Sequence, residues 1–360
     1  MKTGRTLTEL AQEIERQRES KIDYIAPTPA ALMIAPAGGE VQLDLQGHMP
    51  LALNDLAHRQ VSDHTGIPAK YYDSMRAQAP ALLATNVNHW FTAKPAERMV
   101  RTLDGRVRAF LSDRYRPLEN SDLAEAALPT LLDLDLEIIS CEITERRLYI
   151  KAVDKAINRD IPTGRMGDGR HTIFDTVSPA IVISNSEVGS GALSIETAVW
   201  TKACTNLAIF AQRSMKKYHT GARHEIGDDV VAMLSEGTRR LTDAATWAQV
   251  RDVVRAAFDQ ARFDASIKGL TEMVEGPEIK DPVRAIEVAA RQFDFGEAER
   301  GSVLQHLARG GDLTRYGLFN AITRTAEDLA DYDRATEFER AGGKVIELNR
   351  DQWRQIAEAA

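Results

Sequence analysis

The chain has 360 residues, of which 43% are hydrophobic and 6% aromatic, and a formal net charge of −8, a composition typical of a globular protein of about two domains. Its two cysteines, Cys141 and Cys204, are too few for a disulfide framework or a cysteine zinc site, so a reducing cytoplasm is expected. The N-terminus has no apolar segment of signal-peptide length, and no apolar run reaches about 18 residues, so neither secretion nor membrane insertion is expected.

Helical signals dominate the first 90 residues. Residues 6–20 combine apolar and charged positions as a surface helix does, and residues 53–75 read as one or two short helices interrupted by Gly66 and Pro68. We therefore predict an N-terminal helical region at residues 1–90. Whether it forms a separate domain or a layer over a sheet stays open at this stage.

Near residue 98 the spacing of apolar residues changes from the helical period to the two-residue period of β-strands. Residues 98–103 and 106–113 flank Asp104-Gly105, a dipeptide that supplies the positive φ angles of a two-residue turn, so a hairpin is predicted. A helix capped by Asn120 or Ser121 follows. Alternating polarity then predicts two more strand pairs, at 136–143 with 146–153 and at 178–186 with 192–200.

Residues 91–225 thus form a predicted β-rich central domain of about six strands. Within it, residues 156–171 read as a polar, glycine-bearing loop, long enough to have a function. From 226 to 360, apolar residues recur at three- and four-residue spacing, which predicts a helical C-terminal domain. The predicted fold class is α+β: a central, mostly antiparallel sheet with flanking helices, followed by an all-helical C-terminal domain.

Charge is distributed unevenly over these three parts. Basic minus acidic residues come to −2 for residues 1–90, +1 for 91–225 and −7 for 226–360. A polyanion would be repelled by the acidic C-terminal domain and tolerated by the central one. The alternative is that the acidic helical surfaces have no such role.

One stretch of the central domain, between Glu196 and Glu225, contains no acidic residue. If residues 201–218 form a helix, most of its cations share one face and its apolar residues the other. If they continue the preceding strand, the cations gather at its end, and both readings stay open. In a chain of net charge −8, such a stretch indicates an anionic partner. Its cationic side chains are Lys202, Arg213, Lys216, Lys217 and Arg223, accompanied by His219 and His224.

A second basic group lies on the predicted hairpin and directly after it. Guanidinium groups pair with phosphates and stack on bases, and the interleaved Phe110 and Tyr115 add stacking rings, as a groove for single-stranded nucleic acid requires. The alternative is a solvent-facing strand whose arginines pair with acidic helices. The candidate contacts here are Arg106, Arg108, Arg114 and Arg116, and we expect them to form the second wall of a groove with the acid-free stretch.

Several blocks of the chain resemble, in order, those of a known family. The blocks are GIPAKYYDSM, NVNHWF, VRAFLSDRYRPLEN, ISNSEVGSGALSIETAVWTKACTNLAI and HTGARH, and the similarity runs over residues 55–225. They look like the phage/plasmid-like family of domain of unknown function 932. The tail at residues 314–348 is similar to the C-terminal part of many phage- and plasmid-borne proteins. This resemblance implies a mobile genetic element as the setting and implies no activity.

Signals for catalysis or a cofactor are weak. The chain has no phosphate-binding GxxxxGK[ST] loop and no nucleophile elbow, so we expect no cofactor and no catalytic residue, and we favour a protein that is not an enzyme. A metal site is the weaker alternative, because no recognised spacing joins the possible ligands. The histidines that would form it are His171, His219 and His224, with Asp175 and with Glu187 or Glu196 completing the shell.

The resulting hypothesis is a cytoplasmic protein that binds or anneals nucleic acid, above all single-stranded DNA, in phage or plasmid replication or recombination. A homo-oligomer is expected by analogy with strand-annealing proteins, with the acidic C-terminal domain contacting a protein partner or a neighbouring subunit. Two alternatives remain. One is a metal-dependent hydrolase or nuclease, and the other is a protein-interaction module that serves host takeover or anti-defence.

Overall fold

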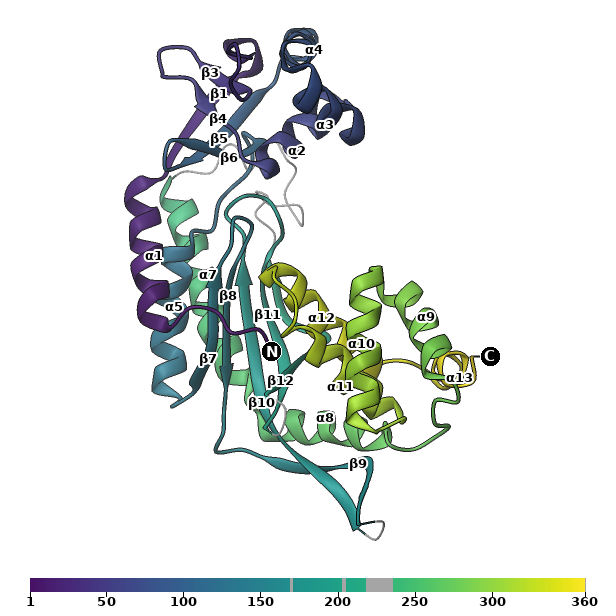
Figure 1. Ribbon diagram of the computed structural model, residues 1–360. Helices are drawn as coiled ribbons and strands as arrows, with labels where there is room; N and C mark the ends of the chain where they lie inside the picture. The colour runs from purple at the N-terminus through teal and green to yellow at the C-terminus, as the bar shows by residue number, and fades with distance from the viewer. Residues whose placement is uncertain (169–170, 203–204, 218–235, 360) are drawn as a thin grey trace.

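The computed structural model describes residues 1–168, 171–202, 205–217 and 236–359, without the side chains of residues 211–214, 236 and 238–240. The fold class is α+β, as predicted, with antiparallel sheets and with helices throughout the described C-terminal part. Figure 1 shows an N-terminal lobe at the top, a central sheet below it, and a group of C-terminal helices beside the sheet.

The central sheet is antiparallel, as predicted, and its described strands follow the order β12-β11-β10-β8-β7, with β9 pairing β10 outside this path. Its long central strand, β10, pairs with β11 on one edge and, along successive parts of its length, with β9 and β8 on the other. The strands are β7 (Glu137–Ile143), β8 (Leu148–Val153), β9 (Arg159–Gly167), β10 (His171–Asn185), β11 (Leu193–Thr201) and β12 (Asn206–Lys217).

The acid-free stretch is a strand over residues 206–217, so the helical reading of 201–218 is wrong and the strand reading is right. Leu207 and Ile209 are buried and pair in register with Trp200 and Ala198 of β11. A helix would have left the outer edge of β11 without backbone partners. The pairing therefore decides the structure where the local pattern was ambiguous.

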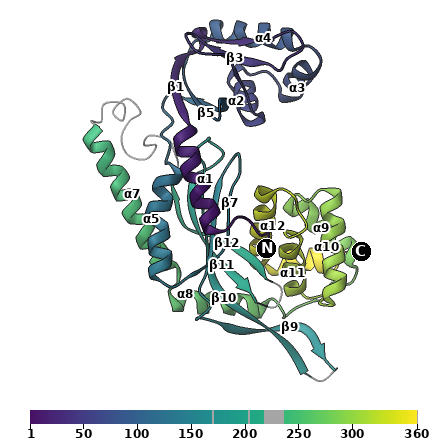
Figure 2. The ribbon, with the colours of Figure 1, turned by 60° about the vertical axis from the view of Figure 1, so that its left-hand side comes forward.

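Helices cover both faces of the central sheet, as Figures 1 and 2 show. On one face, Ile150, Ile183 and Ile195 pack against α1 (Leu7–Ser20), α5 (Asn120–Asp133) and α7 (Glu236–Ala257). On the other face, Tyr149, Val182 and Ile209 form a smaller cluster with Tyr332. The helices on that side are α11 (Arg315–Thr325) and α12 (Tyr332–Ile346).

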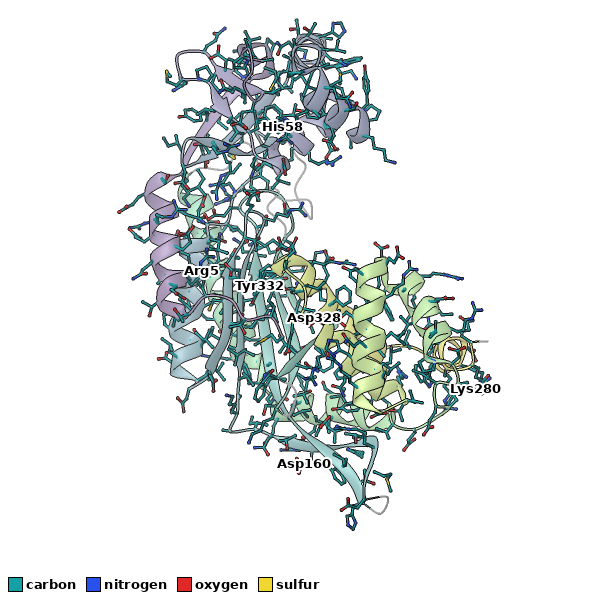
Figure 3. All side chains as sticks on the ribbon, viewed as in Figure 1. Arg5, His58, Asp160, Lys280, Asp328 and Tyr332 are labelled. Atoms are coloured by element: carbon teal, nitrogen blue, oxygen red, sulfur yellow. The ribbon has the colours of Figure 1, made fainter. Side chains whose placement is uncertain are left out.

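Polar contacts fix α12 to its face of the sheet. Tyr332 points toward the sheet in Figure 3, and its hydroxyl lies 2.6 Å from the Ser140 hydroxyl. Lys151 of β8 and Glu339 of α12 form a fully buried ion pair at 2.7 Å. These contacts connect the C-terminal helices rigidly to the sheet, because a buried charge is costly unless its partner stays in place.

The N-terminal region contains short strands that the sequence did not predict, besides the predicted helices. The strands β1 (Ile22–Pro27), β2 (Ala31–Ile34), β3 (Gln42–Leu45) and β4 (Leu51–Ala52) are too short for a clear period of two. The 3₁₀ turn at Thr28–Ala30 joins β1 to β2. The helices of this lobe are α2 (Asp55–Thr65), α3 (Ala69–Gln78) and α4 (Pro80–Ala93).

The predicted hairpin exists and belongs to the N-terminal lobe. Strands β5 (Glu97–Leu103) and β6 (Arg106–Ser112) flank Asp104 and Gly105, whose φ angles are 51° and 72°. The hairpin extends the sheet β1-β5-β6 rather than the central sheet. Its arginines therefore lie on a different layer from the acid-free stretch, which changes the expected groove.

The polar segment at 156–171 is largely strand instead of loop. Strand β9 and the first residues of β10 pair as a hairpin that projects beyond the central sheet. Polar side chains on both faces concealed the alternation that would have identified these strands. The projecting hairpin exposes Met166 and Phe174.

The C-terminal part is helical over the described residues, as predicted. Helix α8 leads from the end of α7, past the β12 edge of the sheet, to the helices on the other side (Figure 1). None of the helices in the described ranges is both long and apolar enough to cross a bilayer. The remaining helices are α8 (Gln260–Glu272), α9 (Pro282–Phe293), α10 (Glu297–Gly310) and α13 (Arg350–Ala357).

Candidate nucleic-acid interface

The arginines of the hairpin point into the molecule and not toward solvent. Arg101 is fully buried: it donates to Asp23 at 2.9 Å, to a Glu119 carboxylate oxygen at 2.7 Å and to the Glu187 carbonyl at 2.8 Å. Arg108 is buried as well and donates to the Glu187 carboxylate at 2.8 Å. The two guanidinium groups therefore connect the N-terminal lobe to the loop between β10 and β11.

This junction is a network of alternating charges. Lys21 contacts Glu119 and lies 3.5 Å from Glu187, whose carboxylate also accepts from the Asn120 backbone N–H at 2.7 Å. Burial would raise the pKa of Glu187, but the charge of Arg108 and further hydrogen bonds lower it to about 2. Burial, then the nearby Glu187 charge, raise the pKa of Glu119. Three cations and three carboxylates share this site, so its cations are already neutralised.

Two further arginines of the hairpin also have partners within the lobe. Arg106 is half exposed and forms an ion pair with Glu40 at 3.2 Å. The guanidinium of Arg98 lies 5.2 Å from the centre of the Phe110 ring, a cation–π distance. The alternative in which hairpin arginines form ion pairs with carboxylates therefore holds for Arg101, Arg106 and Arg108. The carboxylates come mainly from loops and strands, however, and not from helices.

A different basic group forms where β12 ends and α7 lies beside it. Arg116 donates to Asp243 of α7 at 2.5 Å, and the Lys217 ammonium contacts the Thr246 hydroxyl. Burial lowers the pKa of Lys217, Asp243 raises it, and the charge of Arg116 lowers it again, so the two cations lie close enough to repel each other. Residues from the two basic segments predicted to form one groove thus meet at Asp243.

Two exposed cations continue this group along the chain. Lys216 precedes Lys217 on β12, opposite Ser194 of β11, and is exposed. Arg114 is exposed in the segment that follows β6. We call Arg114, Arg116, Lys216 and Lys217 the β12-end cluster.

The remaining candidates lie elsewhere or outside the description. Lys202 is exposed in the turn before β12, at the opposite end of that strand from Lys217. Arg213 faces Glu196 in the β11–β12 register, but its side chain is not among those described. Arg223, His219 and His224 lie outside the described residues.

The possible metal ligands among the described residues lie apart from one another. His171 is exposed at the start of β10, on the projecting hairpin. Asp175 accepts from Arg165 and from the Tyr316 hydroxyl, each at 3.1 Å, and Glu196 accepts from Arg340 at 2.7 Å. Over the described ranges, no three His, Cys, Asp or Glu side chains come together as a metal site would need.

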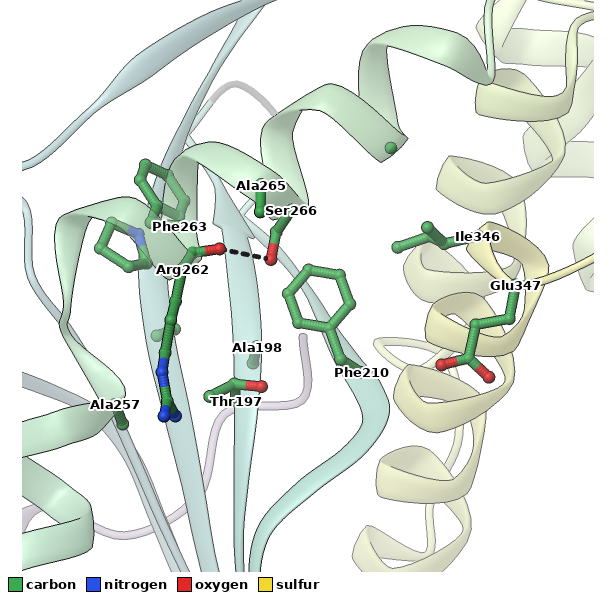
Figure 4. A pocket seen from close by; sticks show the side chains of 13 residues that line it. Thr197, Ala198, Phe210, Ala257, Arg262, Phe263, Ala265, Ser266, Ile346 and Glu347 are labelled. Atoms are coloured by element: carbon green, nitrogen blue, oxygen red, sulfur yellow. Dashed lines mark hydrogen bonds between the residues drawn. The ribbon is translucent and has the colours of Figure 1, made fainter.

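The structure also contains a pocket that the sequence did not indicate. It lies beside the middle of β12, between α8 and the end of α12, and has a volume of about 550 Å³ (Figure 4). Phe210 of β12, Arg262 of α8 and Glu347 just after α12 are among the residues that line it. These residues are far apart in the sequence, and no local pattern connects them.

Comparisons with known proteins add no relative. Neither family models, nor curated protein sequences, nor solved structures match the chain.

Proposed function

We propose that the protein binds single-stranded nucleic acid, DNA by preference, through the β12-end cluster, and that it catalyses no reaction on the bound strand. The meeting of Arg116 and Lys217 beside Asp243 carries this proposal, because like charges are brought together only at a cost that a bound anion would relieve. Arg114 and Lys216, which are close to Arg116 and Lys217 in the sequence, are both exposed.

A single strand suits this surface better than a duplex does. The cations of β12 lie along a sheet edge, and Phe210 on the same strand lines an open pocket. Exposed bases of a single strand have faces that can stack on such a ring, whereas the bases of a duplex are already stacked. Because residues 226–360 carry a net charge of −7, we expect the phosphate backbone to follow the cations at the β12 edge.

The setting that we propose is phage or plasmid replication or recombination, in agreement with the family resemblance of residues 55–225. Strand annealing is the specific activity, since it requires a groove of cations and no bound nucleotide or metal. A homo-oligomer would extend the binding path from one copy to the next.

The test is a titration of a fluorescent oligonucleotide at several salt concentrations. Binding should weaken steeply as salt rises, and replacing Arg116, Lys216 and Lys217 together by Gln should reduce the slope of log K against log salt by about 2. Glutamine keeps a polar side chain beside Asp243 and Thr246. The matched control replaces Lys268, Lys280 and Arg284, which are exposed on or beside α8 and α9.

Two outcomes would contradict the proposal. One is the absence of binding to single- or double-stranded DNA or RNA at micromolar protein and low salt. The other is unchanged affinity and salt slope in the folded triple variant. Oligonucleotide cleavage that stops on chelation would instead support a metal-dependent nuclease.

A further inference from the structure

A pocket lies directly on the strand that carries part of the β12-end cluster. Phe210 lines it from β12, six residues before Lys216 in the same strand, or about 20 Å along an extended chain. We propose that this pocket receives one base of the bound strand. The inference rests on the proposed function and adds to it a specific contact beyond the phosphates.

The backbone pairing explains why the pocket opens at this point. Ile209 pairs with Ala198, and Arg213 pairs with Glu196, so Thr197 of β11 faces three residues of β12, from 210 to 212. Such a bulge interrupts the ladder and redirects side chains. Thr197, Ala198 and Phe210 consequently line a space beside the sheet instead of closing it.

The other walls come from helices. Arg262, Phe263 and Ser266 of α8 line one side, and Ile346 and Glu347 line the opposite side. Figure 4 shows Arg262 and Glu347 at opposite ends of the pocket, with the Phe210 ring between them. The volume of about 550 Å³ is within the range of small-molecule sites and is sufficient for a nucleoside unit.

The chemistry of the lining matches a base better than a free phosphate or an apolar chain. An aromatic ring offers a stacking surface, a guanidinium offers donors, and a carboxylate offers acceptors, and the polar edge of a base carries both acceptors and donors. Both Arg262 and Glu347 are exposed, and neither forms an ion pair with another residue in the described part of the chain. A phosphate alone would be repelled by Glu347, and a purely apolar ligand would leave both charges without a partner.

The test compares an intact oligonucleotide with the same strand carrying abasic positions. The wild-type protein should bind the abasic strand about tenfold more weakly, since stacking of each base contributes to affinity. Phe210→Leu keeps apolar bulk but removes the ring, so the ratio of the two dissociation constants, abasic over intact, should fall toward one. Arg262→Ala should reduce the same ratio about threefold. Tyr71→Ala and Lys268→Ala are controls, because Tyr71 is exposed on the remote α3 and Lys268 is exposed on α8 outside the pocket lining.

The outcomes separate this inference from the proposed function. If Phe210→Leu retains the full abasic penalty while binding persists, or weakens both strands equally, the base pocket is refuted and the cationic surface remains. If the wild-type protein binds neither strand, the proposed function fails, and the pocket assignment fails with it. A thermal unfolding curve like that of the wild type establishes that the variant is folded.

Discussion

Two basic groups of this molecule look alike in the sequence and differ in the structure. The β5–β6 hairpin carries Arg101, Arg106 and Arg108, and each of them forms an ion pair with a carboxylate of the N-terminal lobe or of the junction below it. In the β12-end cluster, Arg116 contacts Asp243 of α7 and Lys217 lies close to both, while Arg114 and Lys216 are exposed. The difference shows that a basic stretch in the sequence can offer a surface to an anionic partner only where the fold leaves its cations exposed to solvent.

Burial separates the two groups further. A fully buried guanidinium such as Arg101 loses its hydration and therefore needs all of its partners, whereas exposed cations such as Lys216 keep their hydration and can exchange it for phosphate contacts. The buried hairpin arginines, Arg101 and Arg108, should consequently affect folding, and the β12-end cluster should affect binding.

The largest effect is expected from Arg101→Ala. The substitution leaves the carboxylates of Asp23 and Glu119 without their shared guanidinium, so the free energy of unfolding should fall by about 3–5 kcal/mol. Urea denaturation followed by circular dichroism measures the change. A loss below about 1 kcal/mol would mean that the junction is held by other contacts and that the division by burial is wrong.

The next effect concerns acid stability at the same junction. Because the pKa of Glu187 is lowered to about 2 by its partners, its ionised form stabilises the folded protein above its ordinary pKa of 4.5, and that stability is lost as the pH falls toward 2. Glu119, whose pKa is raised, acts in the opposite direction and offsets part of this loss.

Substituting Glu187→Gln should therefore reduce the free energy of unfolding by about 2 kcal/mol at pH 7 and by progressively less toward pH 2. Urea titrations at a series of pH values give the difference between the two proteins. Glu40→Gln is the matched control, since Glu40 is half exposed and pairs with an exposed arginine. A difference between Glu187→Gln and the wild type that stays constant with pH would refute the role given to the Glu187 charge.

Local signals in the sequence predicted the elements that depend on neighbours in the chain. Asp104-Gly105 predicted the hairpin turn, and alternating residues predicted the pairs β7–β8 and β10–β11. The three- and four-residue spacing predicted the C-terminal helices. These features are encoded within a few residues and can be recognised without the fold.

Contacts between distant segments could not be predicted in the same way. Arg106 and Arg108 share a face by alternation, yet only Arg108 is buried, because the loop that carries Glu187 lies over it. The strand at 206–217 depended on β11 for its pairing, and Asp243 reaches Arg116 only through the packing of α7. The sequence therefore identifies which residues are basic, but it does not show which of them the fold buries or which carboxylates they contact.

The smallest effects are expected from Arg106→Ala, and they discriminate most directly between the two groups. Arg106 and Glu40 are each about half exposed, so losing their ion pair should change the free energy of unfolding by less than about 1 kcal/mol. If the hairpin lies outside the binding surface, the affinity for an oligonucleotide and its salt dependence should also stay unchanged. Arg116→Ala should instead lower that salt slope by about 0.7, the loss of one phosphate contact. Equal reductions of the salt slope in the two variants would mean that the hairpin is part of the binding surface, because both arginines would then contact the strand.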